Sequence, residues 1–130
     1  MCGITAYIGN EKCIDIIINS LKTLSNRGYD SAGFVLSDTS TGDMVTKKSI
    51  TKNDKLAIDE LVKASVDVSG NYNVGVGHTR WATHGMTNEA NCHPHTDSNK
   101  NFYLVHNGII ENYKELKVLL LMNGYTFYSE

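Results

Sequence analysis

The sequence predicts a single folded domain of the α+β class. At 130 residues, 41% hydrophobic and 20% charged, the chain is long enough for one domain that buries roughly two-thirds of its extended surface. A helical pattern over residues 14–24 presents an aliphatic face, and short β-prone runs lie before and after it. That face needs a sheet to bury it, so we expect helices and strands to pack against one another.

The chain opens with a predicted strand and a predicted helix. Residues 4–8 form an apolar run that ends at Gly9-Asn10, which places Cys2 at the N-terminal edge of a strand. Aliphatic side chains then recur at helical spacing on one face: Ile14, Ile17, Ile18, Leu21 and Leu24. We expect this helix to end near Asn26-Arg27-Gly28.

A hairpin and a second helix are predicted next. Residues 32–37 and 44–49 have strand character and are joined by a turn at residues 41–43. Asn53-Asp54 is expected to cap a helix that runs to about Ser65. The expected inner side of this helix consists of Ala57, Ile58, Leu61, Val62 and Ser65.

A strand and a long loop follow. Residues 74–78 predict a strand that contains two glycines, where a backbone or a ligand can come close. No periodicity is sustained over residues 79–101, and this stretch is dense in Arg, Trp and His. A loop of that length and composition is typical of a functional site rather than of disorder.

The C-terminal part predicts a strand, a helix and the start of another strand. Residues 102–105 form the first strand, and Asn112 can cap a helix that ends at Asn123-Gly124. The expected buried face of this helix consists of Tyr113, Leu116, Leu119 and Leu120. Residues 125–128 resemble the beginning of a further strand.

Charge, hydropathy and cysteine content exclude several classes of protein. The net charge of -2 comes without a basic stripe, so nucleic acid is not an expected partner. No apolar run reaches the ~18 residues that span a bilayer, and no signal-peptide pattern opens the chain, so no membrane association is expected. The three cysteines, Cys2, Cys13 and Cys92, fit no disulfide framework. Free thiols favour a reducing, cytoplasmic compartment, with Cys13 as a small buried residue of the first helix.

Cys2 stands directly behind the initiator methionine. Removal of Met1 would expose a thiol and an amine on one residue. A free α-amine has a pKa of about 7.7 to 8.0 and can take the thiol proton, so Cys2 could serve as nucleophile and base together. The alternative is a buried cysteine at the start of a strand, and these first residues alone leave both interpretations open.

Four motifs together resemble one family. They are Met1-Cys2-Gly3-Ile4, Arg27-Gly28-Tyr29-Asp30-Ser31-Ala32-Gly33, His78-Thr79-Arg80-Trp81-Ala82-Thr83-His84-Gly85 and His106-Asn107-Gly108-Ile109-Ile110-Glu111-Asn112. In this order they resemble the glutaminase domain of the glutamine:fructose-6-phosphate aminotransferases. That domain is a class II glutamine amidotransferase of the N-terminal nucleophile hydrolase group. The resemblance covers nearly the whole chain.

The resemblance implies a fold and a reaction. The fold would be an αββα sandwich of two mostly antiparallel sheets between helical layers. In the reaction, the thiol of Cys2 attacks the side-chain amide of L-glutamine, releases ammonia and leaves a thioester that water cleaves to glutamate. The side-chain amide of Asn107 and the N–H of Gly108 match the family's oxyanion donors, whereas a plain Asn-Gly turn is the structural alternative. No cofactor is expected.

The resemblance also implies substrate-binding residues. Arg80 matches the arginine that holds the α-carboxylate of glutamine, for which a guanidinium is well suited. Trp81, Thr83 and His84 match the loop that closes over glutamine, although Trp81 alone would indicate a core or interface residue. Arg27 matches a supporting arginine near the nucleophile, and a purely structural role in its turn is equally compatible with the sequence.

A histidine-rich segment offers a competing metal-site interpretation. Its metal-capable side chains are His84, Cys92, His93 and His95. They lack the paired Cys-x-x-Cys or helical His-x-x-x-His spacing that marks a zinc site. We therefore expect no metal.

Residues 1–130 correspond to a partial, C-terminally incomplete domain when compared with the family. Family members continue into a sugar-phosphate isomerase domain that accepts the ammonia, and the motif holding the α-amino group of glutamine would follow residue 130. Uncovered sheet edges and apolar surface are therefore expected, with a homodimer or another domain as possible cover. A glutaminase for another amide and a noncatalytic glutamine-binding or interaction module remain open alternatives.

Overall fold

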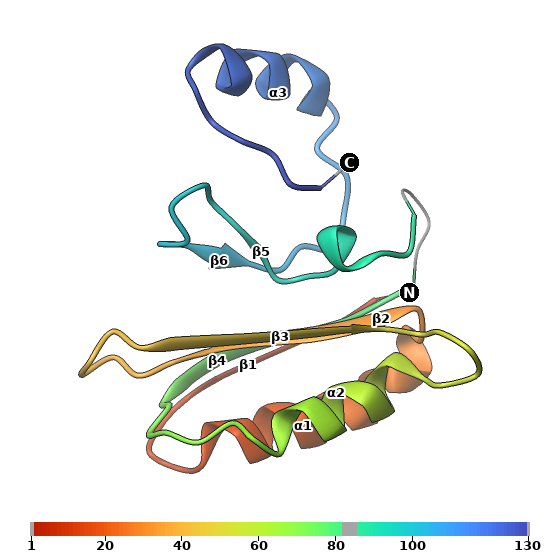
Figure 1. Cartoon of the computed structure of the whole chain (residues 1–130), viewed down its shortest axis with the longest axis vertical. Coiled ribbons are helices and arrows are strands. Elements are labelled where there is room, and N and C mark those ends of the chain that lie inside the picture. The colour runs from red at the N-terminus through yellow and green to blue at the C-terminus, as the bar shows by residue number, and fades with distance from the viewer. Residues whose placement is uncertain (1, 82–85, 130) are drawn as a thin grey trace.

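The computed structural model describes residues 2–81 and 86–129 and arranges them in layers. Helices α1 and α2 lie on one face of a four-stranded sheet, a two-stranded ribbon lies over the other face, and α3 lies beyond the ribbon (Figure 1). In chain order the elements are β1 (Gly3–Ile8), α1 (Cys13–Leu24), η1 (Ser25–Arg27), β2 (Ser31–Ser37), β3 (Met44–Ile50), α2 (Ala57–Ser65), β4 (Val74–Arg80), η2 (Glu89–Asn91), β5 (His95–Thr96), β6 (Tyr103–Leu104) and α3 (Tyr113–Met122). Helices and antiparallel sheets thus confirm the predicted α+β class.

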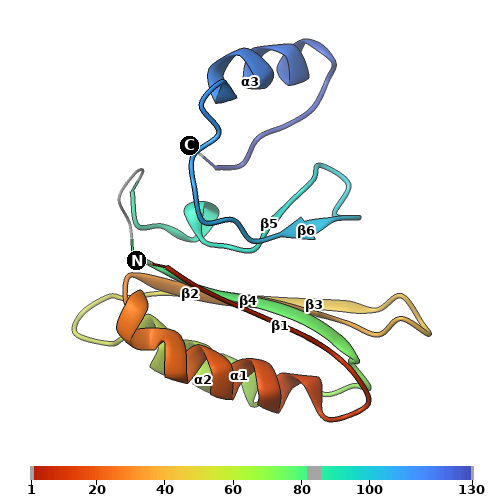
Figure 2. The same cartoon turned by 180° about the vertical axis from the view of Figure 1, so that it is seen from behind.

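The four-stranded sheet brings distant parts of the sequence to one end. Its strand order is β1-β4-β2-β3, and every neighbouring pair is antiparallel. Figure 2 shows the same sheet from behind, with α1 and α2 on its lower side. The register pairs Gly3 with Thr79 and Ser31 with Arg80. The beginnings of β1 and β2 therefore meet the end of β4.

The core lies between this sheet and the two helices. Ile17, Leu21, Phe34, Leu36 and Leu61 have no exposed surface, which confirms the predicted inner faces of both helices. The two glycines of β4 allow α1 to approach closely. A Cβ atom at Gly75 would lie 2.8 Å from Sγ of Cys13, and one at Gly77 would lie 3.0 Å from Cδ1 of Leu21. The close approach expected at these glycines is thus made by the helix.

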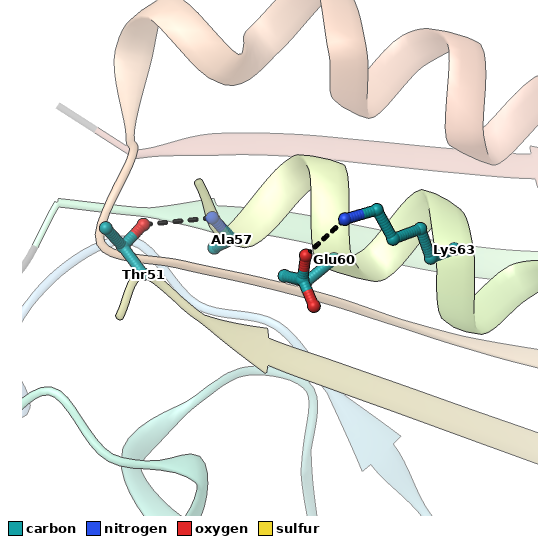
Figure 3. A network of polar contacts seen from close by, with 4 residues as sticks. All are labelled: Thr51, Ala57, Glu60 and Lys63. Atoms are coloured by element: carbon teal, nitrogen blue, oxygen red, sulfur yellow. Dashed lines mark hydrogen bonds and ion pairs between the residues drawn. The ribbon is translucent and has the colours of Figure 1, made fainter. Parts of the chain in front are cut away.

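Helix α2 begins differently from the prediction. Its first amide, the N–H of Ala57, donates to Oγ1 of Thr51 at 2.9 Å (Figure 3). Asn53 and Asp54 instead have positive φ angles, 51° and 61°, in the turn that precedes the helix. The prediction that these two residues cap the helix is therefore wrong, because both are used to reverse the chain. Figure 3 also shows an exposed ion pair between Glu60 and Lys63, which adds little stability at such a site.

The long segment after β4 contains more structure than its aperiodic sequence indicates. Thr79 and Arg80 extend β4, and residues 89–91 and 95–96 form η2 and β5. Oδ1 of Asp97 accepts the backbone N–H of Asn101 at 2.7 Å and that of Phe102 at 2.8 Å. These bonds close the turn between β5 and β6.

Helix α3 departs from the prediction of a buried face. None of its residues is buried, and Leu119 is 57% exposed. The side chain of Asn112 makes no capping hydrogen bond, and residues 125–128 form no strand. The predicted C-terminal end is confirmed: Gly124 has a φ of 83°, and the N–H of Tyr125 donates to the carbonyl of Leu120 at 3.1 Å. The expected uncovered apolar surface is thus present, because the described chain places no layer over this helix.

The structure also bears on membrane association. Over residues 2–81 and 86–129, no helix has both the length and the apolar character needed to cross a bilayer.

Candidate active site

The start of β1 is fixed by a buried hydroxyl. The N–H of Gly3 donates to Oγ1 of Thr79 at 3.2 Å, and that hydroxyl donates to the carbonyl of Leu24 at 3.2 Å. Thr79 has no exposed surface. A Cβ atom at Gly3 would lie 2.8 Å from both Cβ of Leu24 and Oγ1 of Thr79, so only glycine fits. The backbone immediately after Cys2 is therefore held in one place.

The sulfur of Cys2 lies against the backbone of Trp81. The N–H of Trp81 donates to Sγ at 3.4 Å, and Sγ lies 3.7 Å from the carbonyl oxygen of the same residue. Cys2 is half-buried and its thiol is free. The backbone of Trp81 thus offers Sγ both an N–H donor and a carbonyl acceptor.

Asn107 reaches Cys2 from a position 105 residues later in the sequence. Its Nδ2 donates to the carbonyl oxygen of Cys2 at 3.2 Å. Its Oδ1 lies 2.8 Å from Nε2 of His78. Because Oδ1 can only accept, Nε2 of His78 must be the donor. The side-chain amide of Asn107 is thus held at both ends.

Three histidines form a stack behind this amide. The ring of His93 stacks on that of His78 with centroids 4.3 Å apart, and the edge of His95 meets His93 at 4.3 Å. Burial is the main cause that lowers the pKa of His93 to about 3, with the neighbouring His78 as the next cause. Burial also lowers the pKa of His78 and of His95. All three rings are therefore neutral near pH 7.

The histidine stack does not have the form of a metal site. Within residues 2–81 and 86–129, no three His, Cys, Asp or Glu side chains are grouped so as to hold an ion. Nδ1 of His93 instead accepts the N–H of His106 at 3.4 Å. Cys92 is buried, and its Sγ lies 3.3 Å from the carbonyl of Asn88. His84, the fourth predicted candidate, lies outside the described residues.

Gly108 follows Asn107 in a conformation that favours glycine. Its φ is 150°, and a Cβ atom there would lie 3.0 Å from Nε2 of His106. Residues 106–110 are exposed. Gly108 therefore lies in an exposed turn, next to the residue whose side chain contacts Cys2.

Arg80 ends β4 at the same end of the sheet as Cys2. It is half-buried, and its Nη1 donates to the carbonyl of Met86 at 3.4 Å. Its own carbonyl accepts the N–H of Asp30 at 3.1 Å. A Cβ atom at Gly28 would lie 2.7 Å from the carbonyl carbon of Arg80, so the turn before β2 crosses β4 closely. Glycine at position 28 thus meets a backbone requirement.

The remaining predicted site residues differ in where they lie relative to Cys2 and in whether the structure describes them. Trp81 is 43% exposed, and its ring meets that of Tyr29 edge-on with centroids 5.2 Å apart. Arg27 is exposed in η1. Thr83 and His84 lie outside the described residues. The structure thus gathers Cys2, the backbone of Trp81 and Asn107 through direct contacts.

Two contributors were not assigned roles from the sequence alone. His78 forms a hydrogen bond with Asn107, and Thr79 accepts one from Gly3. Their strand does carry a signal: alternate residues of a strand face opposite sides of the sheet, so His78 shares a face with Arg80 and Thr79 faces α1. The pairing of His78 with Asn107 has no local signal, because the two residues lie 29 positions apart.

Comparison with known sequences places the chain in a class. Residues 45–130 match the sequence family described as "Glutamine amidotransferase domain". The chain belongs to this glutamine amidotransferase family.

Comparison with individual curated proteins shows which members of this family the chain resembles. The chain is 49% identical over 130 residues to a glutamine–fructose-6-phosphate aminotransferase (isomerizing) of Pyrococcus horikoshii, covering 100% of this chain and 21% of that protein. It is 46% identical over 130 residues to the enzyme of the same name from Aquifex aeolicus, again covering 100% of this chain and 21% of the relative. The protein of that name from Cyanidium caldarium is 45% identical over 131 residues, 100% of this chain and 20% of the relative. The chain spans about a fifth of the length of these relatives, and the predicted family resemblance is confirmed.

Proposed function

We propose that this chain is the glutaminase part of a sugar-phosphate aminotransferase and hydrolyses L-glutamine to glutamate and ammonia. The observation that carries this proposal is the hydrogen bond from Nδ2 of Asn107 to the carbonyl of Cys2. This bond supports the proposal because it joins the side-chain amide of Asn107 to the residue that carries a half-buried free thiol. Family membership and the relatives' names support the same reaction.

Cys2 is the nucleophile. Once Met1 is removed, the α-amine takes the thiol proton, and the N–H of Trp81 stabilises the resulting thiolate. The sulfur attacks the side-chain carbonyl carbon of glutamine. The α-ammonium returns its proton to the departing nitrogen, which leaves as ammonia. Water, deprotonated by the same amine, then cleaves the thioester to glutamate and restores the thiol.

Asn107 and Gly108 stabilise the oxyanion that forms in each step. Nδ2 of Asn107 carries two hydrogens, so one can hold the carbonyl of Cys2 while the other donates to the oxyanion. The N–H of Gly108 is the second donor. A single donor of this kind contributes about 2.7 to 4 kcal/mol of transition-state stabilisation.

Arg80 binds the α-carboxylate of glutamine. It is half-buried at the end of β4, beside the residue that contacts Sγ of Cys2. A planar guanidinium can make two parallel hydrogen bonds to a carboxylate. Trp81, Thr83 and His84 belong to the loop that closes over the substrate, and Arg27 supports the site from the turn before β2.

The ammonia is passed to a sugar-phosphate acceptor domain. The relatives' names describe an isomerizing fructose-6-phosphate aminotransferase, and each relative is about five times longer than this chain. The domain is an αββα N-terminal nucleophile hydrolase sandwich of cytoplasmic location. Support for that fold comes from the order of layers, with helices, a sheet, a ribbon and a helix (Figure 1).

Release of glutamate and ammonia from L-glutamine tests this function. The wild-type protein and a Cys2→Ser variant are compared, with removal of Met1 confirmed by intact mass, and L-asparagine serves as the control substrate. We expect glutamine turnover that falls at least about 100-fold in the variant, because the hydroxyl is a far weaker nucleophile. Glutamine binding without turnover by correctly processed wild type would instead support a noncatalytic module.

A further inference from the structure

We propose that His78 is a positioning residue that fixes the side-chain amide of Asn107 in the orientation an oxyanion donor beside Cys2 requires. This inference rests on the proposed glutaminase function. His78 itself touches neither Cys2 nor the expected position of the substrate amide. It acts through the bond between its Nε2 and Oδ1 of Asn107, which is 2.8 Å long.

The two contacts of Asn107 select one orientation of its amide. In the observed orientation, Oδ1 accepts from His78 and Nδ2 donates to the carbonyl of Cys2. Rotation of the amide by half a turn would set Nδ2 against the N–H of His78 and Oδ1 against the Cys2 carbonyl. Two donors would then face each other, and so would two acceptors. The Cys2 carbonyl, which can only accept, excludes the rotated amide, and His78 with its hydrogen on Nε2 holds the observed orientation from the other end.

His78 can supply this restraint because it is rigid. Only 1% of its surface is exposed, whereas Asn107 lies in an exposed turn next to Gly108. One face of the imidazole is stacked on His93 at 4.3 Å. The backbone of His78 is held in β4 by pairing with Ile4 on one side and Gly33 on the other. The exposed turn that carries Asn107 is thus held by His78, a buried residue in the interior strand β4.

The neutral state of His78 fits the same role. Burial lowers its pKa, and the charge of Arg80 acts in the same direction, while the bond to Asn107 opposes them. The other titratable groups around the ring, His93 and His95, also have lowered pKa values. A neutral imidazole with its hydrogen on Nε2 donates to Oδ1 without placing a buried positive charge behind the amide.

A pair of variants of similar shape separates the hydrogen bond from the volume of the ring. Glutamine in place of histidine can put an N–H donor close to the position of Nε2, and methionine has nearly the same length and shape without the donor. We therefore compare His78→Gln and His78→Met in the native protein by steady-state glutamine hydrolysis. We expect kcat to fall about 10- to 100-fold in His78→Met, because moving a catalytic group by about 1 Å can lower the rate by that much. KM should stay within about twofold, because Asn107 acts on the oxyanion rather than on bound glutamine.

The two variants are expected to rank in opposite order by folding stability and by kcat. The polar atoms of a buried glutamine side chain need hydrogen-bond partners, whereas a buried methionine needs none. His78→Met should therefore be at least as stable as His78→Gln in urea. A kcat in His78→Gln at least about fivefold above that of His78→Met therefore reports the donor and not the fold. His95→Gln is the matched control, because it removes a ring from the same stack without touching Asn107. Equal kcat values in the two His78 variants, or a change confined to KM, would overturn the proposal.

A second measurement does not depend on turnover. Relaxation of the ¹⁵N-labelled side-chain amide of Asn107 should show an ordered group in wild type and in His78→Gln, and a mobile one in His78→Met. An amide equally ordered in all three proteins would refute positioning by His78. Absence of glutamate release by wild type would refute the proposed function, while the relaxation experiment would still decide the role of His78.

Discussion

The hydroxyl of Thr79 accepts the N–H of Gly3 at 3.2 Å and thereby fixes the residue that follows the nucleophile. The same hydroxyl donates to the carbonyl of Leu24 at the end of α1. One buried side chain thus connects β1, β4 and α1 directly beneath Cys2. The position of the sulfur depends on this connection as well as on its contact with Trp81.

Thr79→Val should weaken both the fold and the site. Valine keeps the shape of threonine but leaves the buried N–H of Gly3 without its acceptor, which costs about 1 to 3 kcal/mol. Urea unfolding should show that loss in the free energy of unfolding, and kcat for glutamine hydrolysis should fall with it. Thr79→Ser keeps the hydroxyl and serves as the control. Equal stability of the valine and serine variants would contradict the assigned role.

Gly33→Ala should displace the segment that carries the histidine stack. A Cβ atom at Gly33 would overlap the carbonyl oxygen of His93, a backbone atom that cannot move alone. Overpacking of this kind costs about 1 to 3 kcal/mol, and it should reduce glutaminase activity because His93 stacks on His78. Gly42→Ala is the control, because a Cβ there meets no atom within 4 Å and only its φ of 80° is strained. Retention of full activity by Gly33→Ala would show that this segment adapts freely.

Stability should decrease on acidification because His93 resists protonation in the folded state. Its folded pKa is about 3, against an ordinary value of 6.5 when the chain is unfolded. The unfolded state therefore binds more protons between these pH values, and the free energy of unfolding falls as pH drops through this window. From pH 7 to pH 5 we expect His93 to contribute a loss of about 1 to 2 kcal/mol, measured by urea unfolding at each pH. Burial is the main cause of this low pKa; the positive charges of Arg80 and Lys48 act in the same direction, and so do His78 and His95 whenever they are protonated.

A variant identifies the source of this pH dependence. His93→Gln should have a flatter stability profile between pH 5 and pH 7 than wild type. An unchanged slope in the variant would show that His93 titrates normally in the folded protein.

The start of α2 offers a test of local structure. Thr51→Val removes the acceptor for the N–H of Ala57 and should destabilise the protein by about 0.5 to 2 kcal/mol, as loss of a helix cap does. Thr51→Ser should retain most of the stability. Asn53→Gly should be neutral or stabilising, because its φ of 51° suits glycine. Clear destabilisation by Asn53→Gly would instead favour the cap predicted from the sequence.

The sequence predicts the first half of the fold well because its patterns are local. The aliphatic spacing over residues 14–24 reproduces α1, and the hairpin of β2 and β3 follows from its turn residues. The cap of α2 was wrong because Thr51 competes with Asn53 for the same amide from outside the expected helix. Helix α3 was found, whereas burial of its apolar residues depends on a layer that the described chain does not provide.

The candidate site shows the same division between local and distant information. The four motifs identify Cys2, Arg80 and Asn107 individually. Strand register then places the start of β1 opposite the end of β4, which no single motif specifies. The bonds from Asn107 to Cys2 and His78 join residues 105 and 29 positions apart, so they become visible only in the folded chain.

The most direct test of the account is the covalent state of Cys2 during glutamine turnover. Protein mixed with L-glutamine is quenched in acid, and its intact mass and peptide map are recorded, with Cys13→Ala as a control for the buried thiol of α1. We predict a mass increase of one glutamyl group, located on an N-terminal Cys2 from which Met1 has been removed, and its absence in Cys2→Ser. Glutamine hydrolysis that proceeds with Met1 retained, or a glutamyl group on Cys13 or Cys92, would contradict the assignment of Cys2 as the nucleophile.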